Sequence, residues 1–258
     1  MSDSALDQPR QPLGIGPLIA ESFSILFRYF VPIVLIAFVP NLLGVLLSGY
    51  LVGFEVVIGL EEVAADGSGS PGLELLTSLV DMVVYSITTA FLVQLAYDAK
   101  LGRPIRIARY IGPALGAIVP IVILGFAVSV MVGLAAIALL IPGLWVYAVF
   151  SVMEPAVVIE RLGYGGLGRS AELTKEYRWP ILGALVPIFI CMALIFVLAF
   201  FIVETLGYQG NLIVSVILFS TIAAVGTSLL SVFVSLLYAR LREIKEGVGV
   251  DEIASVFD

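Results

Sequence analysis

The basic residues of this chain all fall on one side of a predicted membrane. The chain contains about six apolar segments, each long enough to cross a bilayer, whose hydrocarbon core takes about 20 helical residues. All 13 Lys and Arg residues lie at the chain ends or in alternate gaps between these segments. In membrane proteins, Lys and Arg are concentrated in cytoplasmic loops. The pattern therefore predicts an all-α, polytopic membrane bundle with both termini in the cytoplasm.

Apolar segments account for most of the chain. They are predicted at residues 30–53, 73–98, 112–139, 143–159, 180–203 and 211–238. Hydrophobic residues make up 60% of the sequence and charged residues 13%, whereas about a quarter of the residues in soluble domains are charged. The polar stretches between the segments are too short to bury a core of their own. We therefore predict a single integral membrane domain over residues 1–258, with Pro142 and Gly143 in a tight outer turn.

The composition argues against most catalytic chemistry. The chain has no histidine and one cysteine, Cys191, which lies in an apolar run. Histidine is the commonest general base and a frequent metal ligand. The net charge of −7 does not indicate a ligand, because the acidic excess lies in the gaps predicted outside. We expect no catalytic residue, no metal, no cofactor and no nucleic-acid partner, and we predict that the protein is not an enzyme.

Three basic, amphipathic stretches each precede a Val-Pro-Ile sequence in a span. The stretches are residues 14–29, 103–111 and 166–179, and the prolines are Pro32, Pro120 and Pro187. Amphipathic basic stretches of this kind are typical of helices in the membrane interface. The recurrence predicts three units of interfacial helix plus membrane hairpin, at 14–98, 99–160 and 161–240, between tails at 1–13 and 241–258. The alternative is chance, because Val-Pro-Ile arises easily in apolar sequence.

The stretch from Ile141 to Leu182 carries the most distinctive motifs. Pro142-Gly143-Leu144-Trp145 opens a span that closes at Pro155-Ala156-Val157-Val158-Ile159-Glu160, and Arg169-Ser170-Ala171-Glu172-Leu173-Thr174 follows. With Tyr238-Ala239-Arg240-Leu241-Arg242 near the end, these motifs resemble the membrane-domain family named for glycerophosphoryl diester phosphodiesterases. The resemblance implies a bacterial inner-membrane protein and covers the membrane part only. It implies no phosphodiesterase activity, because the catalytic domain of those enzymes is a separate barrel that uses histidines.

Three polar residues within the predicted spans are candidate ligand-binding residues. Glu154 lies deep in the fourth span, where the resembling family has an apolar or small residue, and a carboxylate at such depth is costly enough to suggest function. It would bind a proton or a cationic headgroup, or else pair with an arginine of an interfacial helix. Asp81 and Gln94 lie in the second span, the most polar of the six, and would face an aqueous vestibule.

Two interpretations remain open for the segment after the fourth span. In the first, Glu160 and Arg169 form a structural ion pair at the cytoplasmic surface. In the second, Arg169 and the Ser170 hydroxyl hold a phospholipid phosphate. Arg103, Arg106 and Arg109 are predicted to anchor the chain to the anionic leaflet.

The sequence favours a non-enzymatic scaffold or lipid-interacting protein of a bacterial inner membrane. Membrane lipids are the expected partners, and a protein partner or a homo-oligomer is left open. The alternative is a small-molecule or lipid transporter or channel that uses the polar second span and Glu154. The two would differ in whether Asp81, Gln94 and Glu154 meet in one cavity.

Overall fold

A computed structural model describes residues 12–59, 71–202, 205 and 211–247. Every regular element in these ranges is a helix, which confirms the all-α prediction. The helices are α1 Ile15–Arg28, α2 Phe30–Val52, α3 Phe54–Val57, α4 Pro71–Lys100, α5 Ile107–Ala138, α6 Leu140–Phe150, α7 Met153–Ile159, the 3-10 helix η2 Gly163–Gly165, α8 Gly166–Leu173, α9 Arg178–Ile202 and α10 Leu212–Glu246.

Within the described part of the chain, six helical segments are long and apolar enough to cross a membrane, as the hydropathy pattern predicts. They are Phe30–Val52, Gly72–Lys100, Ile107–Ala138, Leu140–Ile159, Arg178–Ile202 and Leu212–Glu246. Most of the predicted tail 1–13 lies outside the described residues. The predicted tail 241–258 is helical at its start, because α10 continues to Glu246 before Gly247 ends it in a left-handed conformation. The six candidate spans make the chain an integral membrane protein.

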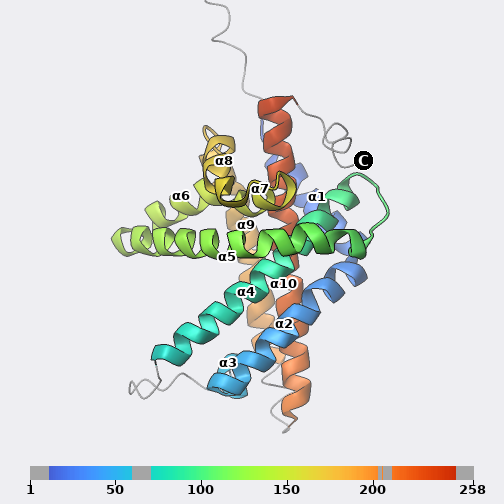
Figure 1. Ribbon diagram of the computed structural model, residues 1–258, viewed down its shortest axis with the longest axis vertical. Helices are drawn as coiled ribbons and strands as arrows, with labels where there is room; N and C mark the ends of the chain where they lie inside the picture. Colours follow the sequence, from blue (N-terminus) through green and yellow to red (C-terminus); the bar gives the residue numbers. More distant parts are fainter. Residues whose placement is uncertain (1–11, 60–70, 203–204, 206–210, 248–258) are drawn as a thin grey trace, which may run out of the picture.

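Helix α10 forms the centre of the molecule and packs against α1, α2, α4 and α9 (Figure 1). Its buried face carries small residues, among them Ala224, Ser228, Ser231 and Ser235. Small residues allow close helix approach, which is the main source of packing energy between membrane helices. The hydroxyls of Ser228 and Ser235 each donate to the carbonyl four residues earlier. These serines therefore shape a close interface without leaving polar atoms unsatisfied.

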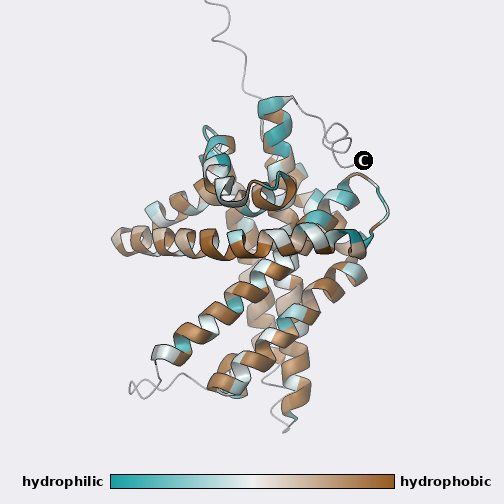
Figure 2. Ribbon diagram, viewed as in Figure 1, coloured by the Kyte–Doolittle hydropathy of each residue, from teal (hydrophilic) through white to brown (hydrophobic). Residues whose placement is uncertain are grey.

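Helices α5 and α6 form a hairpin that runs across the bundle rather than along α10 (Figure 1). In the most apolar stretch of α5, 11% of residues are buried, compared with 44% in α10, and Figure 2 shows α5 as largely hydrophobic. The ring of Trp145 in α6 lies 5.0 Å from that of Trp179 at the start of α9. Helix α6 therefore lies level with the end of the bundle where α9 begins.

The turn between α5 and α6 falls three residues before its predicted position at Pro142. The helix breaks at Leu139, which is extended. Pro142 then lies in the first turn of α6, where the missing N–H is not needed. Gly143 is required for close packing, because a Cβ at this position would lie 2.8 Å from the Cβ of Ala136. Both residues shape the turn from within α6.

The predicted amphipathic stretches differ in structure. Residues of the first form α1, which buries Leu18, Ser22, Ile25 and Leu26 against the bundle, and part of the third forms α8. In the second, residues from Ile107 onward are the first turns of α5. The three prolines also differ in position, since Pro32 is in the first turn of α2 whereas Pro120 and Pro187 are well inside α5 and α9. The three-unit repeat stays a prediction.

Candidate functional site

The fourth predicted span is broken at Ser151 and Val152, between α6 and α7. Ser170 of α8 bridges the break: its hydroxyl donates to the carbonyl of Val149 at 2.9 Å and accepts from the N–H of Val152 at 3.3 Å. Thr174 donates to the same Val149 carbonyl at 3.0 Å. Backbone groups freed inside a membrane protein need such partners. Helix α8 therefore supplies the hydrogen-bond partners that fix the geometry of the break.

A polar knot joins the ends of α7, α8 and α10. We use this name for Glu160, Arg169, Tyr238, Arg242 and Glu246. The Nε of Arg169 donates to both carboxylate oxygens of Glu160 at 3.0 Å, and Arg169 also pairs with Glu246. The Tyr238 hydroxyl donates to Glu160, and Arg242 Nε lies 2.8 Å from Glu246. The predicted ion pair between Glu160 and Arg169 is confirmed.

Arg169 is committed to contacts within the knot, and Ser170 is committed to the break between α6 and α7. Burial works against the charge of Arg169, but its hydrogen bonds and attraction to Glu160 and Glu246 outweigh burial and raise the pKa of the guanidinium. Ser170 is fully buried, and its one proton is donated to Val149. Of the two interpretations of this segment, the structure bears out the ion pair, because Ser170 has no proton left to donate to a phosphate.

Glu154 lies in the first turn of α7, directly after the break. Its carboxylate accepts a hydrogen bond from the Tyr85 hydroxyl of α4 at 3.2 Å, so its partner is a tyrosine and not the arginine that the sequence suggested. Glu154 lines a cavity of about 490 Å³ between α4, α5, α6 and α7, together with Tyr85, Tyr147 and Ser151. We call it the Glu154 cavity.

The three candidate residues in the spans do not meet. Asp81 is exposed on α4 and accepts a hydrogen bond from Ser48 of α2 at 3.4 Å. Gln94 donates to the carbonyls of Ala90 and Tyr110 at 2.8 and 3.1 Å and lines a second cavity. Asp81, Gln94 and Glu154 therefore lie in three separate environments.

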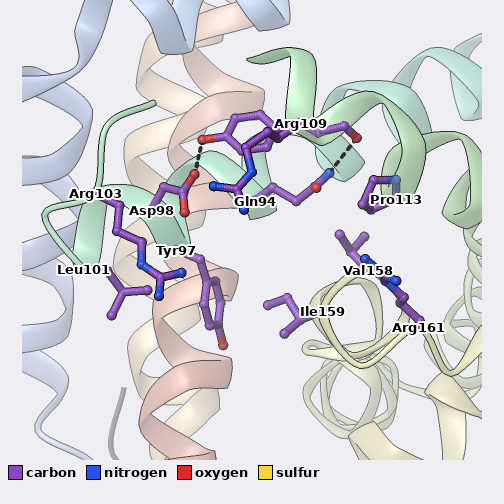
Figure 3. Close-up of a pocket in the computed structure, with 11 residues that line it drawn as sticks. Gln94, Tyr97, Asp98, Leu101, Arg103, Arg109, Pro113, Val158, Ile159 and Arg161 are labelled. Atoms are coloured by element: carbon purple, nitrogen blue, oxygen red, sulfur yellow. Dashed lines mark hydrogen bonds between the residues drawn. The ribbon is translucent and has the colours of Figure 1, made fainter. Parts of the chain in front are cut away.

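The second cavity, the basic cavity, has a volume of about 180 Å³ and lies where α4 ends and α5 begins. Three arginines from separate segments line it: Arg103 between α4 and α5, Arg109 on α5, and Arg161 after α7. Figure 3 shows Arg103 and Arg109 on the Asp98 side of the cavity and Arg161 on the opposite side, beyond Val158. Asp98, the one carboxylate among its described lining residues, accepts a hydrogen bond from Tyr110. Positive charge therefore predominates.

Arg161 occupies an unusual backbone conformation for its residue type. Its φ of 54° is in the left-handed region, which costs a non-glycine residue about 1–2 kcal/mol. Strained positions of this kind concentrate at functional sites. In the sequence, Arg161 simply follows the fourth predicted span. No local signal indicates that a left-handed turn brings it opposite Arg103 and Arg109, some 50 residues earlier in the chain.

An open groove adjoins the basic cavity and shares Pro113 and Arg161 with it. The groove is about 360 Å³ in volume and runs along α5 past Gly112, Gly116 and Ala117. A Cβ at Gly112 or Gly116 would meet nothing within 4 Å. These glycines therefore do not serve close helix packing within the chain but leave free space along the helix surface.

The described residues contain no cluster of His, Cys, Asp and Glu side chains able to hold a metal ion. No protein-family model, no curated protein and no solved structure matches the chain.

Proposed function

We propose that this is a non-catalytic membrane protein that binds an anionic phospholipid, with the phosphate in the basic cavity. The observation that carries the proposal is the convergence of Arg103, Arg109 and Arg161 on one cavity whose described lining residues include a single carboxylate, that of Asp98. Basic pockets between membrane helices are typical binding sites for anionic headgroups. Planar guanidinium groups donate paired hydrogen bonds that match phosphate oxygens.

The adjoining groove supports a lipid over a free anion. A phospholipid joins a phosphate to acyl chains, and the basic cavity joins the groove at Pro113 and Arg161. The groove is lined by Gly112, Gly116, Ala117 and Val157, which present apolar surface without bulky side chains. The headgroup would occupy the cavity while one acyl chain follows α5. A soluble phosphate would gain nothing from the groove.

Thermal unfolding in a maltoside detergent tests the proposal. Phosphatidylglycerol should raise the Tm more than phosphatidylcholine does. An arginine near an anionic lipid contributes about 1 kcal/mol, or about fivefold in affinity, so Arg109→Gln and Arg161→Gln should each need about fivefold more phosphatidylglycerol for the same rise in Tm. Arg106 lies between the lining arginines in sequence but does not line the cavity, so Arg106→Gln is the matched control. Equal losses in all three variants would contradict a defined site.

A second variant separates the lipid from a free phosphate. Gly116→Leu fills the groove without a clash, since nothing lies within 4 Å of its Cβ position. It should weaken the response to phosphatidylglycerol and leave any response to inorganic phosphate unchanged. Loss of neither response would show that the groove takes no part.

We further propose that the end of the bundle carrying Lys100, Arg178 and Arg240 faces the cytoplasm of a bacterial inner membrane. The support is the sorting of basic residues, and Figure 2 shows hydrophilic residues gathered around α8 and the end of α10. A cysteine at Gly102 should be protected from impermeant maleimides added to intact cells. The motifs around Pro142 and Arg169 support membership of the glycerophosphoryl diester phosphodiesterase membrane-domain family, which is likewise a proposal.

The alternative of a transporter or channel has less support. It needs the polar residues of the second span to share one path with Glu154. Instead, Asp81 contacts α2, Gln94 lies in the basic cavity and Glu154 lies in a separate cavity. We therefore propose binding as the function, with any protein partner or homo-oligomer still a prediction.

A further inference from the structure

The Glu154 cavity has a chemistry opposite to that of the basic cavity. Among its described lining residues, Glu154 is the only charged one. The carboxylate accepts one hydrogen bond, from Tyr85, whereas an ionised carboxylate has about four acceptor positions. A carboxylate within the depth of a membrane protein is expected to face a partner that offsets its charge. The walls of this cavity leave room for such a partner to be a ligand.

The aromatic part of the wall also favours a positive charge. Three aromatic residues line the cavity, Tyr85, Tyr147 and Phe150, and aromatic faces attract cations. The carboxylate and the aromatic rings therefore act in the same direction.

The size of the cavity and its apolar surface define the ligand class further. At about 490 Å³ the volume is within the range of small-molecule sites and far exceeds a proton or a bare ion. Met82, Ile121, Val128 and Val132 supply apolar surface. A single carboxylate is also too few oxygen ligands for a divalent cation. The best fit is an ammonium group attached to an apolar body.

We propose that the Glu154 cavity binds an organic cation, with the ammonium between Glu154 and the rings of Tyr85 and Tyr147 and its apolar part against α5. The site is distinct from the basic cavity and does not rest on the proposed lipid binding. The break between α6 and α7 has a role in it, because it places Glu154 and the ring of Phe150 on the same cavity. A zwitterionic lipid headgroup is disfavoured because its phosphate would lie near Glu154.

The test is the binding of benzyltrimethylammonium to the full chain in maltoside detergent, measured by isothermal titration calorimetry. Saturable binding is expected, with at least a tenfold loss in Glu154→Gln. The matched control is Asp81→Asn. It removes a carboxylate on α4 that does not line the cavity, so it should leave binding unchanged. Neopentylbenzene, the uncharged analogue of the probe, should bind at least tenfold more weakly. No binding by the wild type, or equal binding by Glu154→Gln, would overturn the proposal.

A steric variant keeps the test decisive if Glu154→Gln folds poorly. Gly133 lines the cavity, and nothing lies within 4 Å of its Cβ position. Gly133→Leu should fold and block the probe. Dihexanoylphosphatidylcholine should not compete with the probe, and its competition would assign the cavity to a lipid headgroup and overturn the proposal. Because none of these variants touches Arg109 or Arg161, failure here is distinguishable from failure of the phospholipid site.

Discussion

The two breaks that flank α6 are built in different ways. At Leu139, the tip of the α5–α6 hairpin, the backbone satisfies itself: the N–H of Leu139 donates to Ala135, and its carbonyl accepts from Gly143. Leu139 is 69% exposed. At Ser151 and Val152 the chain is buried and depends on Ser170, from another helix. A break at an exposed tip thus needs only local bonds, whereas a buried break needs partners from elsewhere in the fold.

The difference extends to what surrounds each break. The buried break is followed by Glu154 and, at the end of α7, by the polar knot that ties α8 and α10 together. The exposed tip is surrounded by apolar side chains such as Ile137, Leu140 and Ile141. Both candidate cavities are lined by α7 or the residues next to it. The polar contacts between helices therefore lie close to both proposed ligand sites.

Loss of the knot should have the largest effect on stability. Glu160→Ala would leave the partly buried Arg169 and Arg242 without a central carboxylate. Removal of one partner from a buried ion pair costs about 3–5 kcal/mol. Glu246 still pairs with both arginines, so we expect a fall in the free energy of unfolding near the lower end of that range. The measurement is unfolding in mixed detergent micelles followed by circular dichroism.

The control for this variant is Glu172→Ala. Glu172 also pairs with Arg169, at 3.6 Å, but its side chain is 72% exposed. Exposed pairs contribute about 0–1 kcal/mol. A similar cost for both variants would show that the knot is no more than a surface network.

Ser170→Ala should have an intermediate effect, because it removes the partner of the Val152 N–H at the buried break. A buried donor left unsatisfied costs about 1–3 kcal/mol. Thr174 would still bond the Val149 carbonyl, which limits the loss. Ser129→Ala is the control, since Ser129 bonds only within its own exposed turn. A loss below that of the control would mean that the break does not depend on α8.

The sequence predicts those parts of this architecture that depend on local pattern. Helix ranges follow from apolar length, and Glu160 and Arg169 are only nine residues apart in the sequence. Contacts between distant segments have no such signal: Tyr85 meets Glu154, and Arg161 faces Arg103, only through the packing of α4, α5 and α7. The predicted tail includes Arg242 and Glu246 because the apolar run ends before them, yet α10 continues and brings Arg242 to Glu160 and Glu246 to Arg169.

The exposed hairpin should tolerate truncation with the smallest effect. Ile137 is 84% exposed near the tip of α5, and in a membrane its side chain faces lipid in both the folded and the unfolded states. Ile137→Ala should therefore change the free energy of unfolding by no more than about 0.5 kcal/mol. Ile121 on the same helix is 1% exposed, and Ile121→Ala should cost about 2–5 kcal/mol because it leaves a cavity. The two variants share one residue type, one helix and one assay, so a similar cost at both positions would mean that the tip is buried, by the bundle or by a second copy of the chain. That result would remove the contrast between the self-contained tip and the supported break.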